Sequence, residues 1–326
     1  MSGGNVPYHL RVNKAVDRHV FLDLLVRIHG AFSLAKHAYI GFGGPFLEDF
    51  RLVHNQLGLK DLVSLEIDTN VMDRQAFNLP FSRIRRLLQS SGDFIANYNP
   101  RKNAILWFDY AAAKETRVQV EEMQLLLPKL LPGDVYKITI NANPNALNPP
   151  GLEGRAQLEA RIATLRTRLG DFLPTTITED SVSGARSYAK TLLSALLRAA
   201  RESVQSLTEM RYLPVTAFRY ADGPHQMLTA TWCVLPAASS KKFIERAGFT
   251  RWDLFLRDEQ PVPIDVPALS VKERLFVDAR LPSQQARRIS RALRFYCGKD
   301  EEEAVEKLES YARFYRHLPY FSRIVP

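Results

Sequence analysis

Hydrophobic positions in the first part of the chain recur with two alternating periods, one typical of helices and the other of buried strands. Between His9 and His37 the apolar residues fall mostly at helical spacing, and Gly30 interrupts them. A short apolar run then ends in glycines, and helical spacing returns from Phe46 to Leu57. This pattern predicts a helix, a strand, a glycine turn and a second helix, in that order.

The same alternation continues to residue 141. Apolar runs predict strands at residues 62–68, 82–88, 104–108 and 135–141, and helical spacing predicts a helix at about 115–127. Strands that alternate with helices are typical of a parallel sheet whose faces are covered by the helices. The first 141 residues are therefore predicted to form an open α/β sandwich.

The second part of the chain follows a different pattern, which starts at an Asn- and Pro-rich stretch before residue 151. Residues 152–210 have helical spacing, two strand-like runs then flank the turn Ala221–Pro224, and the C-terminal third is helical with proline-rich links. The predicted organisation is a cofactor-binding core at 1–150, a helical insertion at 151–211, a hairpin completing the sheet at 212–236 and a helical C-terminal extension at 237–326.

Composition places the chain among ordinary globular proteins. Of its 326 residues, 46% are hydrophobic and 24% are charged. The sequence shows neither an apolar leader nor an apolar run long enough to cross a membrane, so we expect a cytoplasmic protein. Its two cysteines and seven scattered histidines lack metal-ligand spacing, and we therefore expect no metal and no disulfide framework.

Residues suited to ligand binding follow four of the predicted strands. Open α/β sheets bind ligands beyond the carboxyl ends of their strands, where glycines let a ligand approach the backbone and a carboxylate about 20 residues further on meets ribose hydroxyls. The residues at these four strand ends are Gly41, Phe42, Gly43 and Gly44 after the first, Glu66 after the second, Asp93 and Phe94 after the third, and Asp109 and Tyr110 after the fourth. The sequence therefore predicts a nucleoside-binding site.

Two features favour S-adenosylmethionine over a dinucleotide as the ligand. A dinucleotide motif needs a third glycine for close helix packing under the pyrophosphate, and that position is Phe46. The three carboxylates Glu66, Asp93 and Asp109 would also repel a pyrophosphate, whereas they suit a sulfonium cation.

The ordered set of strand ends resembles the class I S-adenosylmethionine-dependent methyltransferases, over about residues 38–141 and 213–236. The resemblance implies a Rossmann-like sheet of seven strands whose last pair is an antiparallel hairpin. It also implies residue roles: Gly41, Gly43 and Gly44 lie under the methionine part, Glu66 holds the ribose, Asp93 and Phe94 line the adenine, and Asp109 and Tyr110 face donor and acceptor. Tyr39 stands where that family usually has an acidic residue contacting the methionine amino group.

These residues support two hypotheses about function, one of an enzyme and one of a binding module. The first is an enzyme that transfers a methyl group to an oxygen or nitrogen acceptor, with Asp109 and Tyr110 orienting the acceptor and taking or relaying its proton. The second is a non-catalytic, methyltransferase-like module that holds a protein or nucleic-acid partner. Tyr39 and the absence of an Asn/Asp-Pro-Pro-Tyr motif favour the second hypothesis, and the carboxylates at ligand positions favour the first.

The net charge of the chain indicates what kind of partner it would bind. Lys plus Arg number 44 and Asp plus Glu number 35, giving +9, a balance that favours contact with an acidic molecule. Arg287, Arg288, Arg291 and Arg294 recur at helical spacing and offer a phosphate-binding surface, or they form a solvated helix balanced by nearby glutamates. A gel-retardation assay with random DNA and RNA tests nucleic-acid binding, and no retarded band at low salt would exclude it.

Overall fold

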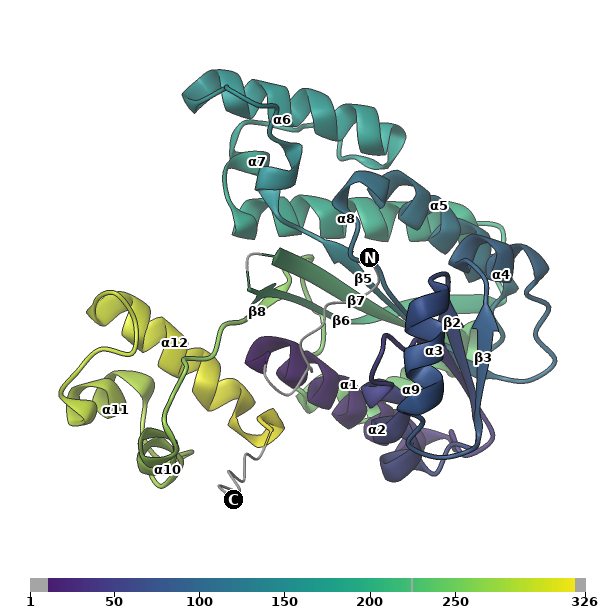
Figure 1. The fold of residues 1–326 in the computed structure, drawn as a ribbon, viewed down its shortest axis with the longest axis horizontal. Coiled ribbons are helices and arrows are strands. Elements are labelled where there is room, and N and C mark those ends of the chain that lie inside the picture. Colours follow the sequence, from purple (N-terminus) through teal and green to yellow (C-terminus); the bar gives the residue numbers. More distant parts are fainter. Residues whose placement is uncertain (1–10, 224, 320–326) are drawn as a thin grey trace.

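The computed structural model describes residues 11–223 and 225–319, which form one eight-stranded sheet with helices on both faces (Figure 1). Residues 9 and 10 of the predicted first helix and Pro224 of the predicted turn lie outside the described residues. The strands are β1 (Ala38–Phe42), β2 (Asp61–Glu66), β3 (Ile84–Leu88), β4 (Ala104–Asp109), β5 (Val135–Asn141), β6 (Met210–Asp222), β7 (His225–Pro236) and β8 (Val262–Ile264).

The strand order is β3-β2-β1-β4-β5-β7-β6-β8. Strands β1 to β5 run parallel, and β7 is antiparallel to both β5 and β6. The predicted Rossmann-like, mostly parallel sheet with an antiparallel hairpin is thus confirmed. The short strand β8, which was not predicted, pairs in parallel with β6.

The order of strands changes direction between β1 and β4, which are neighbours in the sheet. Such a switch point separates the two adjoining loops and leaves a crevice at the carboxyl ends of the strands. We call these ends of β1 to β5 the carboxyl edge of the sheet, and their opposite ends the amino edge.

One face of the sheet, here called the α1 face, is covered by α1 (Val12–Ala31), α2 (Glu48–Leu57) and α9 (Ser240–Arg246). Helix α1 continues through Gly30, where a break was predicted, and ends when Phe32 adopts an extended conformation. A glycine in a helix costs some stability but does not prevent the helix from continuing.

The opposite face, the α5 face, is covered by α4 (Ser91–Asn97), α5 (Thr116–Leu126) and α8 (Ala185–Val204). Figure 1 shows α6 (Gly154–Leu169) and α7 (Asp180–Ser183) outside this layer. Helix α8 buries one apolar side in the same core as the sheet. The segment predicted as an insertion therefore supplies one of the helices that cover the sheet.

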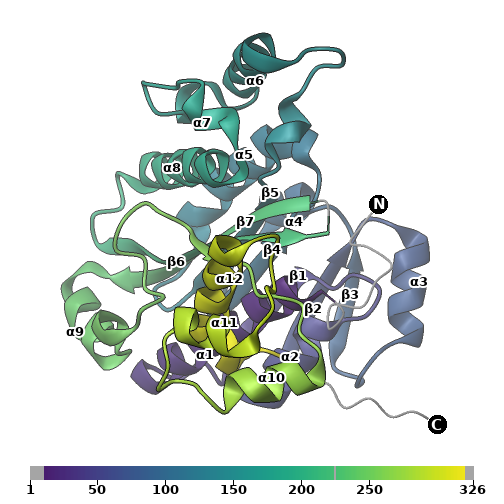
Figure 2. The ribbon, with the colours of Figure 1, turned by 90° about the vertical axis from the view of Figure 1, so that its left-hand side faces the viewer.

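The C-terminal part adds α10 (Val271–Asp278), α11 (Ala286–Leu293) and α12 (Glu301–Phe314), which Figure 2 shows together beside the α1 face. Phe314 packs edge-on against Phe218 of β6, and the Tyr311 hydroxyl donates to Asp278 Oδ1 at 2.7 Å. This part thus shares the core of the α1 face. The remaining helix, α3 (Thr69–Phe77), follows β2 at the end of the sheet that β3 closes.

Helices long and apolar enough to span a membrane do not occur within residues 11–223 and 225–319.

Candidate functional site

The glycines at the end of β1 and in the loop after it lie directly on their neighbours because they lack side chains. A Cβ at Gly41 would stand 2.7 Å from the Trp107 carbonyl oxygen of β4, and one at Gly43 would stand 2.5 Å from Ser64 Oγ of β2. Gly44 has a φ of +50°, in the left-handed region that favours glycine. The loop therefore brings bare backbone to the carboxyl edge at the switch point.

The rest of this loop is fixed by α3. The Asn78 side chain, just past α3, donates to the Pro45 carbonyl oxygen at 2.8 Å, and the Arg74 guanidinium lies 4.8 Å from the centre of the Phe46 ring. Leu47, fully buried, takes a φ of +52° immediately before α2 begins. A buried leucine in the left-handed region is strained, so the surrounding packing holds the loop in one conformation.

Glu66 ends β2 with a carboxylate whose position is set by backbone hydrogen bonds. Its Oε1 accepts from the amide nitrogens of Ile67 at 2.9 Å and Asp68 at 3.0 Å. No cation in the part of the chain that the structure describes pairs with Glu66, and no hydrogen bond engages its Oε2 there. The Oε2 of this buried side chain thus has no hydrogen-bond partner within the described residues, while Asp68 instead caps α3.

Two exposed aliphatic residues lie beside Glu66, and neither was predicted as a site residue. Ile67, the next residue along the chain, is 71% exposed, and Leu88, which pairs with Glu66 across β2 and β3, is 55% exposed. Large aliphatic side chains at strand ends beside a held carboxylate offer an apolar surface next to a polar anchor. For Ile67 the signal in the sequence is an aliphatic residue directly after the carboxylate that ends the strand.

Asp93 lies in the first turn of α4, where it takes part in capping that helix. The Ser90 hydroxyl accepts from the Asp93 amide nitrogen at 3.0 Å and donates to Asp93 Oδ2 at 2.7 Å. The neighbouring Phe94 packs against Tyr98 and Phe108, with ring centres 5.2 and 6.5 Å away. The structure thus gives both predicted adenine-lining residues local roles at the start of α4.

Asp109 and Tyr110 follow one another at the end of β4 and point to opposite faces of the sheet. The Tyr110 hydroxyl donates to Glu122 of α5, and burial together with that carboxylate raises the pKa of Tyr110 well above its ordinary value. Phe42 also lies on this face, in parallel contact with Phe108 at 5.2 Å. The two residues predicted to act together are therefore separated by the sheet.

Asp109 faces α1, where two cations hold it. Its Oδ2 lies 3.3 Å from Lys14 Nζ and 3.5 Å from Arg18 Nη2. Burial alone would raise the pKa of Asp109, but Lys14 and Arg18 outweigh burial and hold that pKa below its ordinary value. At neutral pH the side chain is an ion-paired carboxylate.

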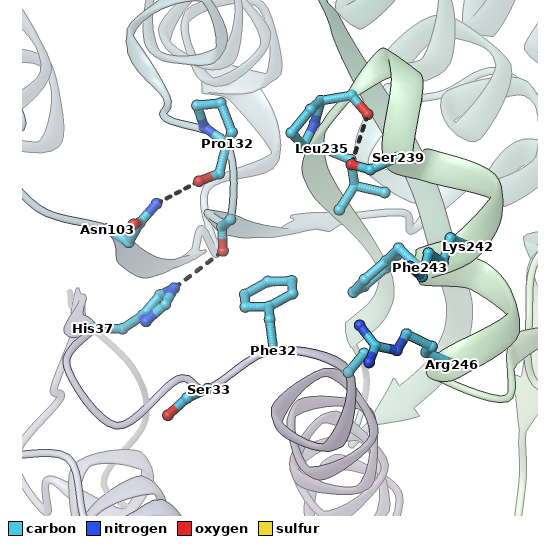
Figure 3. A pocket seen from close by; sticks show the side chains of 13 residues that line it. Phe32, Ser33, His37, Asn103, Pro132, Leu235, Ser239, Lys242, Phe243 and Arg246 are labelled. Atoms are coloured by element: carbon cyan, nitrogen blue, oxygen red, sulfur yellow. Dashed lines mark hydrogen bonds between the residues drawn. The ribbon is translucent and has the colours of Figure 1, made fainter.

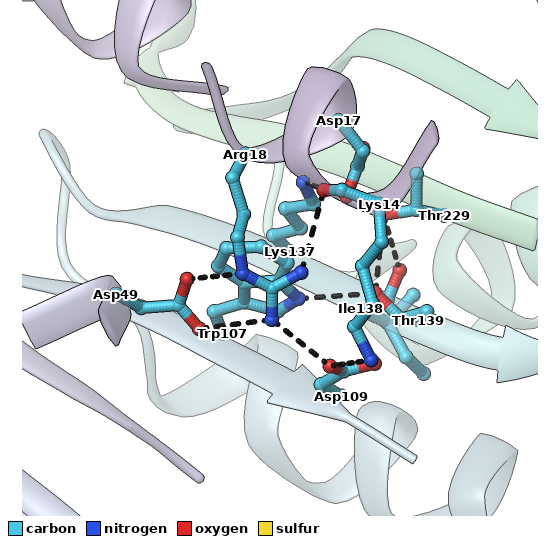
Figure 4. A network of polar contacts seen from close by, with 10 residues as sticks. All are labelled: Lys14, Asp17, Arg18, Asp49, Trp107, Asp109, Lys137, Ile138, Thr139 and Thr229. Carbon is cyan, nitrogen blue, oxygen red and sulfur yellow. Dashed lines mark hydrogen bonds and ion pairs between the residues drawn. The ribbon is translucent and has the colours of Figure 1, made fainter. Parts of the chain in front are cut away.

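Figure 4 shows that this pair belongs to a larger buried set, which we call the α1 network. Arg18 donates from Nε and Nη2 to the two carboxylate oxygens of Asp49, at 2.5 and 3.2 Å. Lys137 Nζ, from the middle of β5, donates to Asp17 Oδ2 at 2.8 Å. The members of the α1 network are Lys14, Asp17, Arg18, Asp49, Asp109 and Lys137, so three cations balance three carboxylates.

Trp107 forms the floor of the α1 network. Lys137 Nζ lies 3.8 Å from the centre of its ring, and the Arg18 guanidinium carbon lies 5.0 Å from it. The Trp107 indole nitrogen donates to Thr139 Oγ1 at 3.0 Å, which fixes the ring. Cation–π contacts in a desolvated place are stronger than on a surface, so Trp107 helps to keep the two cations charged.

Most members of the α1 network were not predicted as site residues, although the sequence carries a signal for them. Lys137 is the one charged residue of β5, whose seven residues are all buried, and a buried charge requires a partner. Lys14 stands three residues before Asp17 and four before Arg18, so the three side chains share one side of α1. Charged residues at such positions in both elements indicate that the two elements pack together through ion pairs.

Two sets of predicted residues lie away from the carboxyl edge. Tyr39 is 1% exposed and packs edge-on against Phe50, so its side chain belongs to the core of the α1 face. The four arginines are exposed on α11 and in the turn after it, and no ion pair engages them within the described residues. A partner surface there stays a prediction.

We expect Asp109→Asn to lower the free energy of unfolding by about 1.5–3 kcal/mol at pH 7, because Lys14 and Arg18 lose a buried anion. A carboxyl whose pKa is depressed in the folded state stabilises above its unfolded pKa, near 3.9, and loses that effect as pH falls through the folded value. The gap between wild type and variant should therefore close below about pH 4. Urea titrations from pH 3 to 7 measure it, and a gap independent of pH would contradict this assignment.

The sequence model of a protein family described as "Putative O-methyltransferase" matches residues 6–326. No curated protein matches the sequence.

Solved structures that resemble the fold are distant in sequence. The plantazolicin methyltransferase BpumL, solved with S-adenosylhomocysteine, is 12% identical, with 67% of this chain and 84% of that chain covered and a TM-score of 0.39. Trm1 from Pyrococcus horikoshii is 10% identical, with 71% and 57% covered and a TM-score of 0.45. The N-methyltransferase NodS from Bradyrhizobium japonicum is 12% identical, with 67% and 95% covered and a TM-score of 0.36.

The predicted resemblance to methyltransferases is thereby confirmed at the level of the family. Because the family model spans nearly the whole chain, this protein belongs to the family described as "Putative O-methyltransferase".

Proposed function

We propose that this protein transfers a methyl group from S-adenosylmethionine to an oxygen of its acceptor. The observation that carries the proposal is the carboxyl edge itself, where the backbone of Gly41, Gly43 and Gly44 lies beside β2 and its terminal carboxylate Glu66. The description of the family supports oxygen rather than nitrogen as the accepting atom.

The residues at the carboxyl edge fit this cofactor. The absence of side chains at Gly41 and Gly43 lets this backbone lie directly against β4 and β2 at the carboxyl edge. The Oε2 of Glu66, which has no hydrogen-bond partner within the described residues, suits the hydroxyl groups of a ribose. The exposed Ile67 and Leu88 offer an apolar surface for a purine. When bound, S-adenosylmethionine supplies an electrophilic methyl group on a sulfonium centre.

Asp109 acts here as a positioning residue rather than a proton acceptor. Its pKa is held below the ordinary value, and a weakly basic carboxylate takes a proton from an alcohol or phenol poorly. Tyr110 keeps its own proton, because burial and Glu122 raise its pKa well above the ordinary value. We therefore infer an acceptor whose oxygen is already anionic, such as a carboxylate, which needs no general base.

The amino end of α1 contributes to the acceptor side of the site. Asn13 Nδ2 donates to the Ala221 carbonyl oxygen of β6 at 3.3 Å, and its Oδ1 accepts from the Val266 amide at 3.1 Å. Lys14 follows directly and reaches Asp109. This arrangement ties the end of β4 to β6 and β8 and fixes Asp109 at the carboxyl edge. A fixed Asp109 can hold the acceptor in the alignment that in-line methyl transfer requires.

Transfer of a deuterated methyl group tests this function. The protein is incubated with CD3-labelled S-adenosylmethionine and a panel of aromatic and aliphatic carboxylic acids and phenols, and products are followed by mass spectrometry. We expect a labelled methyl ester that mild base hydrolyses, formed about tenfold or more slowly by Glu66→Ala at limiting cofactor. Label found only on nitrogen would contradict the proposed acceptor atom.

The second candidate is a methyltransferase-like module that binds a partner without catalysis. The observation that favours it is the pairing of Asp109 with both Lys14 and Arg18, which leaves no general base among Asp109 and Tyr110. It predicts that the cofactor binds while no member of the panel is ever labelled.

A further inference from the structure

A cavity of about 330 Å³ opens at the amino edge of the sheet, away from the candidate active site. Its walls come from the segment after α1, the turn before β5, the end of β7 and helix α9 (Figure 3). Asn103, which lines it, immediately precedes β4, whereas Asp109 ends that strand. Six strand residues at about 3.3 Å each separate the two sites by about 20 Å.

The inner walls are mainly aromatic and apolar. The rings of Phe32 and Phe243 lie 5.4 Å apart, and Phe32 also stacks on His37 with 6.1 Å between ring centres. His37 is buried and its Nε2 contacts the Gly133 carbonyl oxygen at 3.1 Å, which ties it to the turn before β5. Leu235 adds an aliphatic wall. These rings suit a flat apolar body.

Two cations from α9 line the same cavity. Lys242 and Arg246 stand four residues apart on α9 and are both exposed. Neither has an ion-pair or hydrogen-bond partner in the ranges 11–223 and 225–319. Figure 3 shows the Arg246 side chain extending across the cavity towards Phe32. Carboxylates are absent from the lining residues.

We propose that this cavity binds a small organic anion with a flat aromatic body and a carboxylate or similar group. The body lies among Phe32, His37 and Phe243, and the anionic group meets Lys242 and Arg246 at the opening. A volume of about 330 Å³ lies at the lower end of the range for small-molecule sites, which suits a ligand of one or two rings. The site is distinct from the carboxyl edge and does not rest on the proposed methyl transfer.

Calorimetry with 2-naphthoate and the neutral 2-naphthylmethanol tests the proposal, since the two probes share one body and differ in charge. We expect the acid to bind about fivefold or more tightly than the alcohol, and the double variant Lys242→Gln/Arg246→Gln to remove that preference. Lys241→Gln is the matched control, because Lys241 is exposed on the same helix but does not line the cavity. Its affinity for 2-naphthoate should equal that of wild type.

Saturation with S-adenosylhomocysteine distinguishes this cavity from the carboxyl edge. Binding of 2-naphthoate should persist in its presence, whereas displacement would place the probe in the candidate active site and overturn the proposal. Equal affinity for the acid and the alcohol, no binding of the acid at millimolar concentration, or an affinity unchanged in the double variant would each overturn it too. All three substitutions lie on the surface, so folding does not confound the comparison.

Discussion

Lys137→Met is expected to lower the free energy of unfolding by about 3–5 kcal/mol, the cost of leaving a buried charge without its partner. The side chains of Lys137 and Asp17 are 2% and 0% exposed, and their charged atoms lie 2.8 Å apart. Burial lowers the pKa of Lys137 and raises that of Asp17, and their mutual attraction opposes both shifts. Methionine fills a similar volume beside Trp107 but leaves the Asp17 carboxylate without a counter-charge. Equilibrium unfolding in urea measures the loss.

The double variant Asp17→Leu/Lys137→Met separates charge from packing. Removing both charges takes away the desolvation cost together with the attraction, so most of the stability lost in the single variant should return. Lys102→Met is the matched control, because Lys102 pairs with Asp61 on the surface and should contribute less than about 1 kcal/mol. If the double variant were as unstable as Lys137→Met, the loss would come from packing rather than from charge.

Gly41→Ala is expected to destabilise the protein by about 1–3 kcal/mol, because the new Cβ would stand 2.7 Å from the Trp107 carbonyl oxygen of the neighbouring strand. Backbone in the middle of a sheet moves less readily than a side chain, so β1 and β4 must separate. The matched substitution Gly30→Ala should stabilise by up to about 1 kcal/mol, since Gly30 lies within α1 with open space around it.

The two alanine variants are compared by urea unfolding, and their effects should have opposite sign. Because β1 is displaced, the Gly41→Ala protein should also bind S-adenosylhomocysteine more weakly than wild type does. The Gly30→Ala protein should bind it with the affinity of wild type. A Gly41→Ala protein as stable as wild type would mean that the contact between β1 and β4 is loose, and the close-packed loop inferred here would be wrong.

Strands that are buried on both faces were predictable because most of their residues are apolar. Val135–Asn141 was predicted with its observed bounds, and Ala104–Asp109 to within one residue. The hairpin was also predicted, because its turn residues stand between two strand-like runs. Strand β8 was not, since three residues with a central proline carry no periodic signal.

The position of the site was predictable because parallel strands end at a common edge, whereas the orientation of its side chains was not. Glu66 and the glycine loop lie at the carboxyl edge as the order of strands requires. Asp109 and Tyr110, adjacent in sequence, point to opposite faces, since neighbouring residues of a strand alternate. The side chains that pair with Asp109 and Tyr110 come from the helices that cover the two faces, α1 and α5. The α1 residues that pair with Asp109 are about 90 positions away in sequence.

Helix α1 shows where reasoning from the pattern fails. It buries Lys14, Asp17 and Arg18 as well as its apolar residues, because it lies between the sheet and the C-terminal part of the chain. A hydrophobic pattern assigns charged residues to the solvent side, and only knowledge of Lys137 and Asp109 beneath α1 corrects that assignment.

Calorimetric titration with S-adenosylhomocysteine tests the central claim most directly, with wild type, Glu66→Ala and Asp61→Ala compared and NAD as a control ligand. Asp61 is the matched control because it lies on the same strand as Glu66 but at the amino edge. We predict that wild type and Asp61→Ala bind alike, that NAD does not bind, and that Glu66→Ala binds about tenfold or more weakly, a loss of about 1.4 kcal/mol or more. No binding by wild type, or equal binding by Glu66→Ala, would contradict a cofactor site at the carboxyl edge.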